Sequence, residues 1–203
     1  MAPFGAAGWA ALRGGRAVIF VTVGAQMPFD RLVRAVDDWA GRGRVPAEIF
    51  AQIGPSPLRP RHMRWTRFLT PGEFLAQVGA ADLLVAHAGM GSIITALEHG
   101  KPLLIMPRRG ELGETRNDHQ VATAHRFRGL GSVDVAFDEQ EVVVRLDRFE
   151  SRPLSERTVA VPCPHRSAGC AWAAVAPCAP HPGTACPHLL ASLRNFIRVV
   201  SQV

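Results

Sequence analysis

The chain has 203 residues, of which 47% are hydrophobic and 20% charged, and its formal net charge is +6. This composition can form a packed core, and no apolar run approaches the roughly 20 residues of a membrane-spanning helix. Global disorder and a membrane-spanning protein are therefore excluded as first interpretations. The basic charge alone would suit a nucleic-acid-binding protein. However, Lys101 is the only lysine, tyrosine is absent and the arginines are spread along the chain, so we expect no nucleic-acid partner.

An alternation of strands and helices runs through the first three quarters of the chain. Residues 17–23 are an almost continuous apolar run, which is typical of a strand buried on both faces of a parallel sheet. Gly24 ends that run, and a helical pattern begins at Pro28. The further strands are expected at residues 48–53, 63–69, 82–86, 102–107 and 132–136. The further helices are expected to start at Thr70, Ser92, Asn117 and Glu139. This alternation predicts an α/β fold, a Rossmann-like parallel sheet flanked by helices.

Segments of a different kind flank the domain predicted at residues 17–149. Residues 1–16 lack the compact apolar stretch of a secretory signal and are expected to form a flexible extension. Residues 150–188 are rich in proline and hold all four cysteines, but the cysteine spacing is too long for a typical zinc pair, so no metal site is expected. We interpret this segment as a disordered insert or as a stretch read in a shifted frame. Residues 189–203 resume an amphipathic pattern and are expected to form a helix.

The loop at residues 87–91 follows an expected buried strand and precedes an expected helix. Gly89 and Gly91 allow the backbone to pass close to a ligand. The following helix directs its free N–H groups and its positive dipole end at the loop, which favours a phosphate group. Ser92 is expected at the N-cap, where it could cap the helix or bind a phosphate oxygen, and His87 could donate to the same anion. A serine-capped tight turn explains the loop equally well.

Two further polar features follow this loop. Glu98 lies about two helical turns after Ser92, where its carboxylate could accept hydrogen bonds from a ribose or could simply face solvent. Asn117, Asp118 and Gln120 lie at the start of a later helix. They could bind sugar hydroxyls, although Asn or Asp at this position is also an ordinary N-cap.

These motifs occur together, in a fixed order and spacing. The set comprises residues 20–24, 28–30, 87–92, 98, 100–102, 107 and 118–120. It resembles the C-terminal domain of glycosyltransferase family 28, which is the donor-binding half of a GT-B fold. It is also similar to the small catalytic subunit of two-component transferases. Those include the dolichol-pathway N-acetylglucosamine transferase and bacterial exopolysaccharide transferases.

The resemblance implies a role for each matching residue. Residues at the donor diphosphate would be Thr22, Gly24, Gly89, Met90, Gly91 and Ser92. His87 would be catalytic and would also contact the diphosphate, and Glu98 would bind the ribose. The sugar would be bound by Asn117, Asp118 and Gln120.

The resemblance also implies a chemistry and a partner. A UDP-sugar would be the substrate, with no cofactor, and the absence of an Asp-x-Asp motif fits an inverting, metal-independent transfer. The length provides only one of the two nucleotide-fold domains of a GT-B enzyme. We therefore expect a membrane-anchored partner subunit that binds a lipid-linked saccharide acceptor and holds this chain at the cytoplasmic face of a membrane. The alternative is a non-catalytic, nucleotide-sugar-binding regulatory subunit.

Overall fold

The computed structural model describes residues 16–43, 47–128 and 133–152. The predictions for residues 1–16, 150–188 and 189–203 therefore lie outside the described residues, apart from Arg16 and residues 150–152. None of the helices formed by the described residues is long and apolar enough to cross a membrane.

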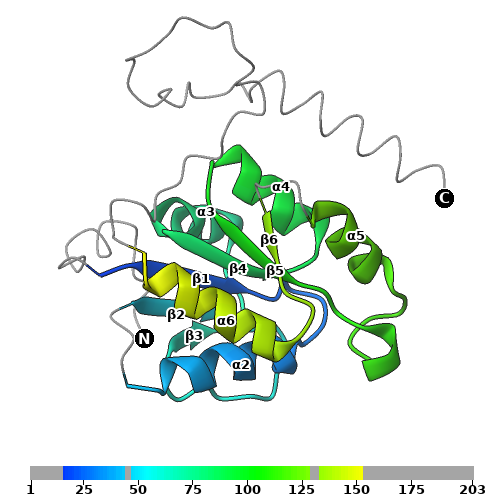
Figure 1. Ribbon diagram of the computed structural model, residues 1–203, viewed down its shortest axis with the longest axis horizontal. Coiled ribbons are helices and arrows are strands. Elements are labelled where there is room, and N and C mark those ends of the chain that lie inside the picture. The colour runs from blue at the N-terminus through cyan, green and yellow to red at the C-terminus, as the bar shows by residue number, and fades with distance from the viewer. Residues whose placement is uncertain (1–15, 44–46, 129–132, 153–203) are drawn as a thin grey trace, which may run out of the picture. The chain divides into compact units, whose positions relative to one another are not determined.

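A single sheet of six parallel strands forms the centre of the fold (Figure 1). Its strands are β1 (Val18–Thr22), β2 (Glu48–Gln52), β3 (Arg64–Thr66), β4 (Leu83–His87), β5 (Leu103–Met106) and β6 (Val133–Val135). Their order is β3-β2-β1-β4-β5-β6, and every neighbouring pair is parallel. This is the strand order of doubly wound nucleotide-binding sheets. The predicted Rossmann-like α/β fold is confirmed.

Helices cover both faces of the sheet, which explains why its central strands are apolar throughout. On one face lie α2 (Asp30–Ala40) and α6 (Glu139–Glu150). On the other lie α3 (Pro71–Ala80), α4 (Met90–Glu98) and α5 (His119–Phe127) (Figure 1). All five residues of β1 are buried, because alternate side chains face the two helical layers.

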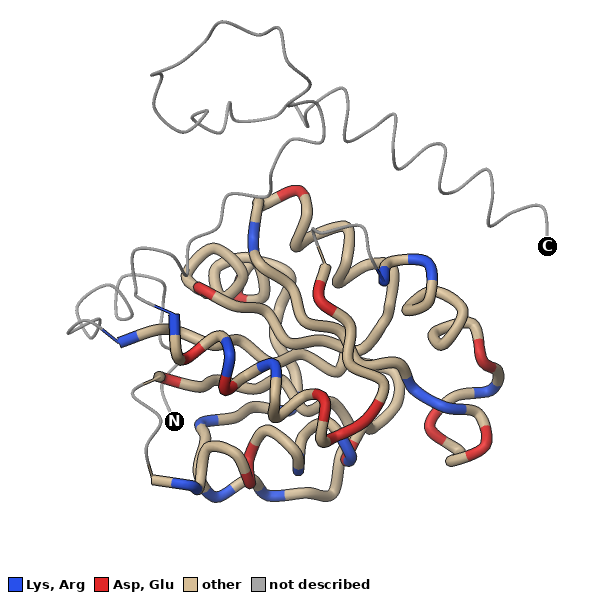
Figure 2. Tube along the Cα trace, in the orientation of Figure 1, with Lys and Arg blue, Asp and Glu red and all other residues tan. Residues whose placement is uncertain are grey.

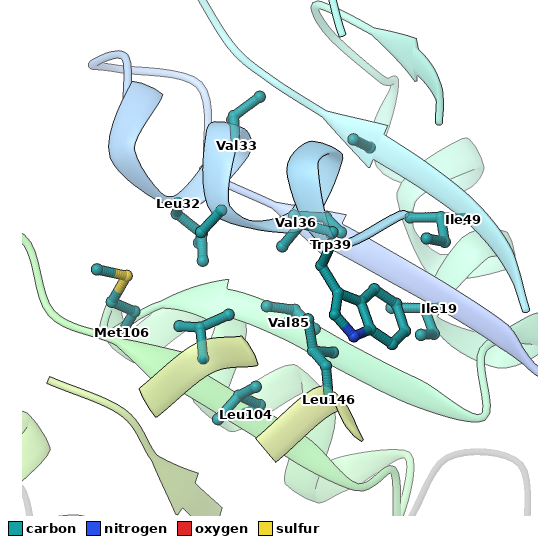
Figure 3. Packing of buried hydrophobic residues seen from close by; sticks show 14 of the residues in the cluster. Ile19, Leu32, Val33, Val36, Trp39, Ile49, Val85, Leu104, Met106 and Leu146 are labelled. Carbon is teal, nitrogen blue, oxygen red and sulfur yellow. The ribbon is translucent and has the colours of Figure 1, made fainter. Parts of the chain in front are cut away.

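Trp39 joins the two helices of the first layer. Its ring lies over Ile19 and beside Leu146 in the apolar core (Figure 3). Its Nε1 donates a 2.7 Å hydrogen bond to Asp147. On the opposite face, Phe74 makes an edge contact with Phe20, with ring centroids 5.6 Å apart. The apolar positions predicted for α2 are thus part of the core on one face of the sheet, and those of β1 contribute to both faces.

The ends of several helices follow their sequence signals. The capping box predicted at Thr70 is present, since the Thr70 hydroxyl accepts the Glu73 N–H and Glu73 accepts the Thr70 N–H. Gly100 ends α4 in the left-handed conformation, with φ +58°. The Lys101 ammonium then donates to two carbonyl oxygens at the end of α3, those of Gly79 at 2.7 Å and Ala81 at 2.8 Å.

Several element bounds differ from prediction, those of β3, α2 and α6 among them. Strand β3 is only three residues long, because the chain turns after Thr66 toward the capping box. Helix α2 begins at Asp30, two residues after Pro28. Helix α6 continues to Glu150, because Phe149 is buried in the core that α6 shares with α2.

Candidate functional site

The strand order reverses between β1 and β4, which pair directly in the sheet. The loops after these two strands leave the carboxyl edge of the sheet on opposite sides. Ligands of open α/β sheets bind in the crevice that such a reversal creates. The loop at residues 23–29 and the turn at residues 88–89 border this crevice. Gly24 and Gly89 lie in them, and Gly91 lies in the first turn of the helix that follows.

The turn after β4 leads directly into α4, which begins at Met90 with Gly89 as its N-cap. The prediction that Ser92 is the N-cap is therefore wrong: Ser92 is the third residue of the helix. The Ile93 N–H already bonds the Gly89 carbonyl at 3.2 Å, and burial of Ile93 fixes the helix at this earlier start. No side chain of the described residues makes a capping hydrogen bond at this helix start. The N–H groups of its first turn therefore remain available to a ligand.

His87 ends β4, and its imidazole ring lies between the two loops. A Cβ atom placed on Gly24 would be 3.0 Å from the His87 Cε1 atom, and one placed on Gly89 would be 2.2 Å from its Nε2 atom. Gly24 also has φ +75°, a backbone conformation that favours glycine. The backbone can thus lie this close to the His87 ring only because residues 24 and 89 are both glycine.

The environment of His87 keeps its imidazole neutral at neutral pH. Burial and, to a smaller extent, the charge of Arg108 lower the pKa of His87 to about 4, against a smaller opposing effect of the Thr22 backbone. Its Nδ1 atom is buried and has no hydrogen-bond partner among the described residues. His87 can therefore offer a bound group an N–H donor, but it adds no positive charge and is a weak base.

Arg108, which follows β5 and Pro107, is a residue of this region that the sequence interpretation missed. Its side chain is only 5% exposed. One terminal nitrogen donates to the carbonyl oxygens of Val23 at 2.7 Å and Met27 at 2.6 Å. Its Nε atom is buried and has no partner among the described residues. The available signal was an arginine directly after a buried parallel strand, at the edge where such sheets bind ligands.

Thr22, the last residue of β1, fixes the loop that borders the crevice. Its side chain is buried, and its hydroxyl donates to Gln52 at 2.8 Å and accepts the Gly24 N–H at 3.3 Å. Gly54 closes against the same loop, because a Cβ atom there would lie 2.8 Å from the Gly24 carbonyl oxygen. The Thr22 hydroxyl is thus used to shape the loop around Gly24.

The polar cluster at the start of α5 is also placed at this edge. Asp118 is the N-cap residue of α5, as the N-cap interpretation has it, but its side chain makes no capping bond within the described residues and instead accepts the Gly110 N–H at 2.8 Å. Gln120 accepts the backbone N–H of Arg108 at 3.2 Å. Asn117 accepts the His119 N–H at 3.5 Å. These bonds fix the β5–α5 loop and bring the cluster next to Arg108.

Glu98 is placed apart from this group. It is the last residue of α4 and is exposed. A helix rises about 1.5 Å per residue, so Glu98 lies about 12 Å along the axis from Met90. The structure thus brings Gly24, His87 and Gly89 together, whereas the role of Glu98 stays a prediction.

Residues 18–161 match the sequence model of the Glycosyltransferase family 28 C-terminal domain. The chain belongs to this family. No match was found among curated protein sequences. The matched range includes both glycine loops, Arg108 and the start of α5, so the crevice described above is part of the family domain.

Several solved structures share the fold. MurG from Acinetobacter baumannii superposes with a TM-score of 0.54 at 18% identity, over 79% of this chain and 49% of that one. The calicheamicin glycosyltransferase CalG4 gives a TM-score of 0.53 at 18% identity, over 74% and 38%. The UDP-GlcNAc 2-epimerase from Neisseria meningitidis gives 0.52 at 13% identity, over 74% and 41%. The chain spans less than half the length of each of these proteins.

Proposed function

We propose that this domain binds the diphosphate of a UDP-sugar in the crevice between β1 and β4. The observation that carries the proposal is the start of α4, where the helix N-terminus has no side-chain cap among the described residues and faces a loop held by Arg108. Free N–H groups, the helix dipole and a buried cation all favour an anion. Gly24 and Gly89 allow the backbone to approach it closely.

The same arrangement suits sugar transfer. Negative charge develops on the leaving diphosphate, and fixed donors aimed at that charge lower the barrier. The first-turn N–H groups of Met90, Gly91 and Ser92 would supply such donors, and the neutral His87 would add one more. Asp118 and Gln120 would contact the sugar. In this proposal the protein replaces the metal ion that other transferases use, and direct displacement inverts the anomeric centre.

We further propose that this chain is the catalytic, donor-binding subunit of a heterodimer. The motif resemblance to two-component transferases supports this, as does the low pKa of His87, which makes it a poor general base. The base would come from a membrane-anchored partner that binds a lipid-linked saccharide. The partner would hold this domain at the cytoplasmic face of the membrane.

Calorimetry tests the donor site first. The full chain is titrated in EDTA with UDP-N-acetylglucosamine, which the motif resemblance suggests as donor, then with UDP and uridine. We expect UDP and the UDP-sugar to bind much more tightly than uridine, because the diphosphate is the recognised group. Equal, weak binding of all three would refute the diphosphate site.

Transfer is then measured with and without the co-expressed partner in membranes. The proposal predicts transfer only with the partner. The regulatory-subunit alternative is favoured by the same observation, since the low pKa makes His87, the histidine of the crevice as the structure describes it, a weak base. Tight donor binding with no transfer in the presence of the partner would support that alternative.

A further inference from the structure

Arg108 is a buried cation with no acidic partner among the described residues. Six arginine–carboxylate ion pairs and one contact between His62 and Asp37 are formed in that part of the chain, and none includes Arg108. Burial lowers the pKa of Arg108 and the more distant charge of Glu114 opposes this, but a guanidinium stays charged in proteins. Removing such a charge from water is costly unless other groups compensate it. Here two backbone carbonyl oxygens accept hydrogen bonds from the guanidinium. Because carbonyl groups are neutral, the positive charge of Arg108 is not cancelled by them.

Arg31 provides the contrast on the same side of the crevice. Its guanidinium also lies 5.4 Å from the Phe29 ring, as that of Arg108 does. However, Arg31 is paired with both carboxylate oxygens of Glu114 at 2.9 Å, and with Glu139 at 3.4 Å. Figure 2 shows basic and acidic residues interspersed along the described chain. Arg108 differs from Arg31 because it is buried without an ion pair to any described carboxylate, at the edge where the donor would bind.

The contacts of Arg108 also fix the shape of the β1–α2 loop. Its two carbonyl acceptors, on Val23 and Met27, enclose the turn that contains Gly24. Charge-assisted hydrogen bonds of this kind are short and strong. Gly24 in this turn and Gly89 at the start of α4 both lie close to the His87 ring, where an added Cβ atom would be 3.0 Å and 2.2 Å from it. Arg108 thus holds the first loop in the position where it approaches the ring shared with the second.

We propose that Arg108 is a positioning residue of the donor site, which holds the β1–α2 loop opposite the α4 N-terminus and places behind it a positive charge that no carboxylate of the described residues pairs with. The inference rests on the proposed function, since the anion that would use this charge is the donor diphosphate. Arg108 acts through the loop and through the local field, and the reacting sugar need not contact it.

Three variants of the full chain test this: Arg108→Met, Arg108→Lys and the control Arg109→Met. Arg109 is the adjacent arginine, but it is paired with Glu111 and the Phe137 carbonyl. Kd values for UDP and uridine are measured by calorimetry. We expect Arg108→Met to weaken UDP binding about tenfold or more, with uridine binding and the control unchanged. Arg108→Lys should be intermediate, because an ammonium keeps the charge but sits on a shorter side chain, which places its nitrogen farther from the Val23 and Met27 carbonyls.

A second readout needs no ligand. Titration of the His87 ring by NMR should show a higher His87 pKa in Arg108→Met, because the nearby charge is gone, and an unchanged one in Arg109→Met. If the wild type binds UDP and Arg108→Met binds it equally well, the positioning role of Arg108 is refuted and the proposed function still stands. If the wild type binds no UDP, the proposed function fails, and an unchanged His87 pKa would then overturn the positioning role too. Should Arg108→Met not fold, Arg108→Lys decides: wild-type UDP affinity in that variant would contradict the role of the two hydrogen bonds from Arg108 to the β1–α2 loop.

Discussion

The helices α3 and α4 both start at the carboxyl edge of the sheet, yet their first turns are built in opposite ways. The start of α3 is closed by its own residues, because Thr70 and Glu73 satisfy each other's backbone N–H groups. The start of α4 has a glycine in place of the cap and no capping side chain among the described residues. A helix N-terminus that the chain caps itself is structural, whereas one left open beside a buried cation is suited to bind an anion.

The largest effect should come from filling the open turn. In Gly89→Ala the new methyl group would lie 2.2 Å from the His87 Nε2 atom. We expect a loss of about 3 kcal/mol in the free energy of unfolding, as for severe overpacking, and loss of UDP binding. Urea unfolding and calorimetry measure the two effects. Wild-type values for both would mean that the close packing of His87 has no consequence.

As the pH falls, the free energy of unfolding should decrease first through His87, beside the start of α4, and only later through Glu73, at the start of α3. The pKa of His87 is lowered from 6.5 to about 4 in the folded protein, so the unfolded chain binds this proton first. The free energy of unfolding should therefore fall as the pH drops from 6.5 to 4. The contribution of His87 to this fall is about 3 kcal/mol at pH 4, relative to neutral pH. The hydrogen bonds from Thr70 lower the pKa of Glu73, so the stability it contributes is lost only below its usual value of 4.5.

Comparing the pH dependence of unfolding in the wild type and in His87→Gln isolates the first effect. We expect the variant to be less sensitive to pH between 6.5 and 4, because it lacks the group that takes up the proton. Parallel curves for the two proteins would contradict a buried, neutral His87.

Removing the α3 cap should affect stability alone. Thr70→Ala deletes the hydroxyl that accepts the Glu73 N–H, at a cost of about 1 kcal/mol. UDP affinity should not change, since this cap lies in a helix start that binds no ligand. A fall in UDP affinity with unchanged stability would reverse the distinction between the two helices.

Gly91→Ala should give the smallest effect on folding and serves as a control for Gly89→Ala. A Cβ atom on Gly91 would meet nothing within 4 Å in the described part of the chain. Alanine is favoured over glycine inside a helix, so the free energy of unfolding should rise by about 0.5 kcal/mol. Weaker UDP binding in this stable variant would place the diphosphate against Gly91, and destabilisation would contradict the open space seen there.

The sequence predicted the features that depend on short-range patterns. The apolar runs of β1, β4 and β5, the Thr70 capping box and the glycine turn after β4 could all be read locally. The start of α4 could not, because burial of Ile93 moved it ahead of the serine that local propensity favours. Arg108 could not be distinguished from the other arginines, because its two carbonyl acceptors are 81 and 85 residues away in the chain.

The central claim, that the open start of α4 holds the diphosphate, is tested most directly by an NMR titration of backbone amides with UDP in EDTA. We predict saturable shifts of the amide signals of Gly24, Gly89, Met90, Gly91 and Ser92. The amides of Gly72 and Glu73, in the capped first turn of α3, should not move. Unchanged signals at residues 89–92, or equal shifts at both helix starts, would contradict the account.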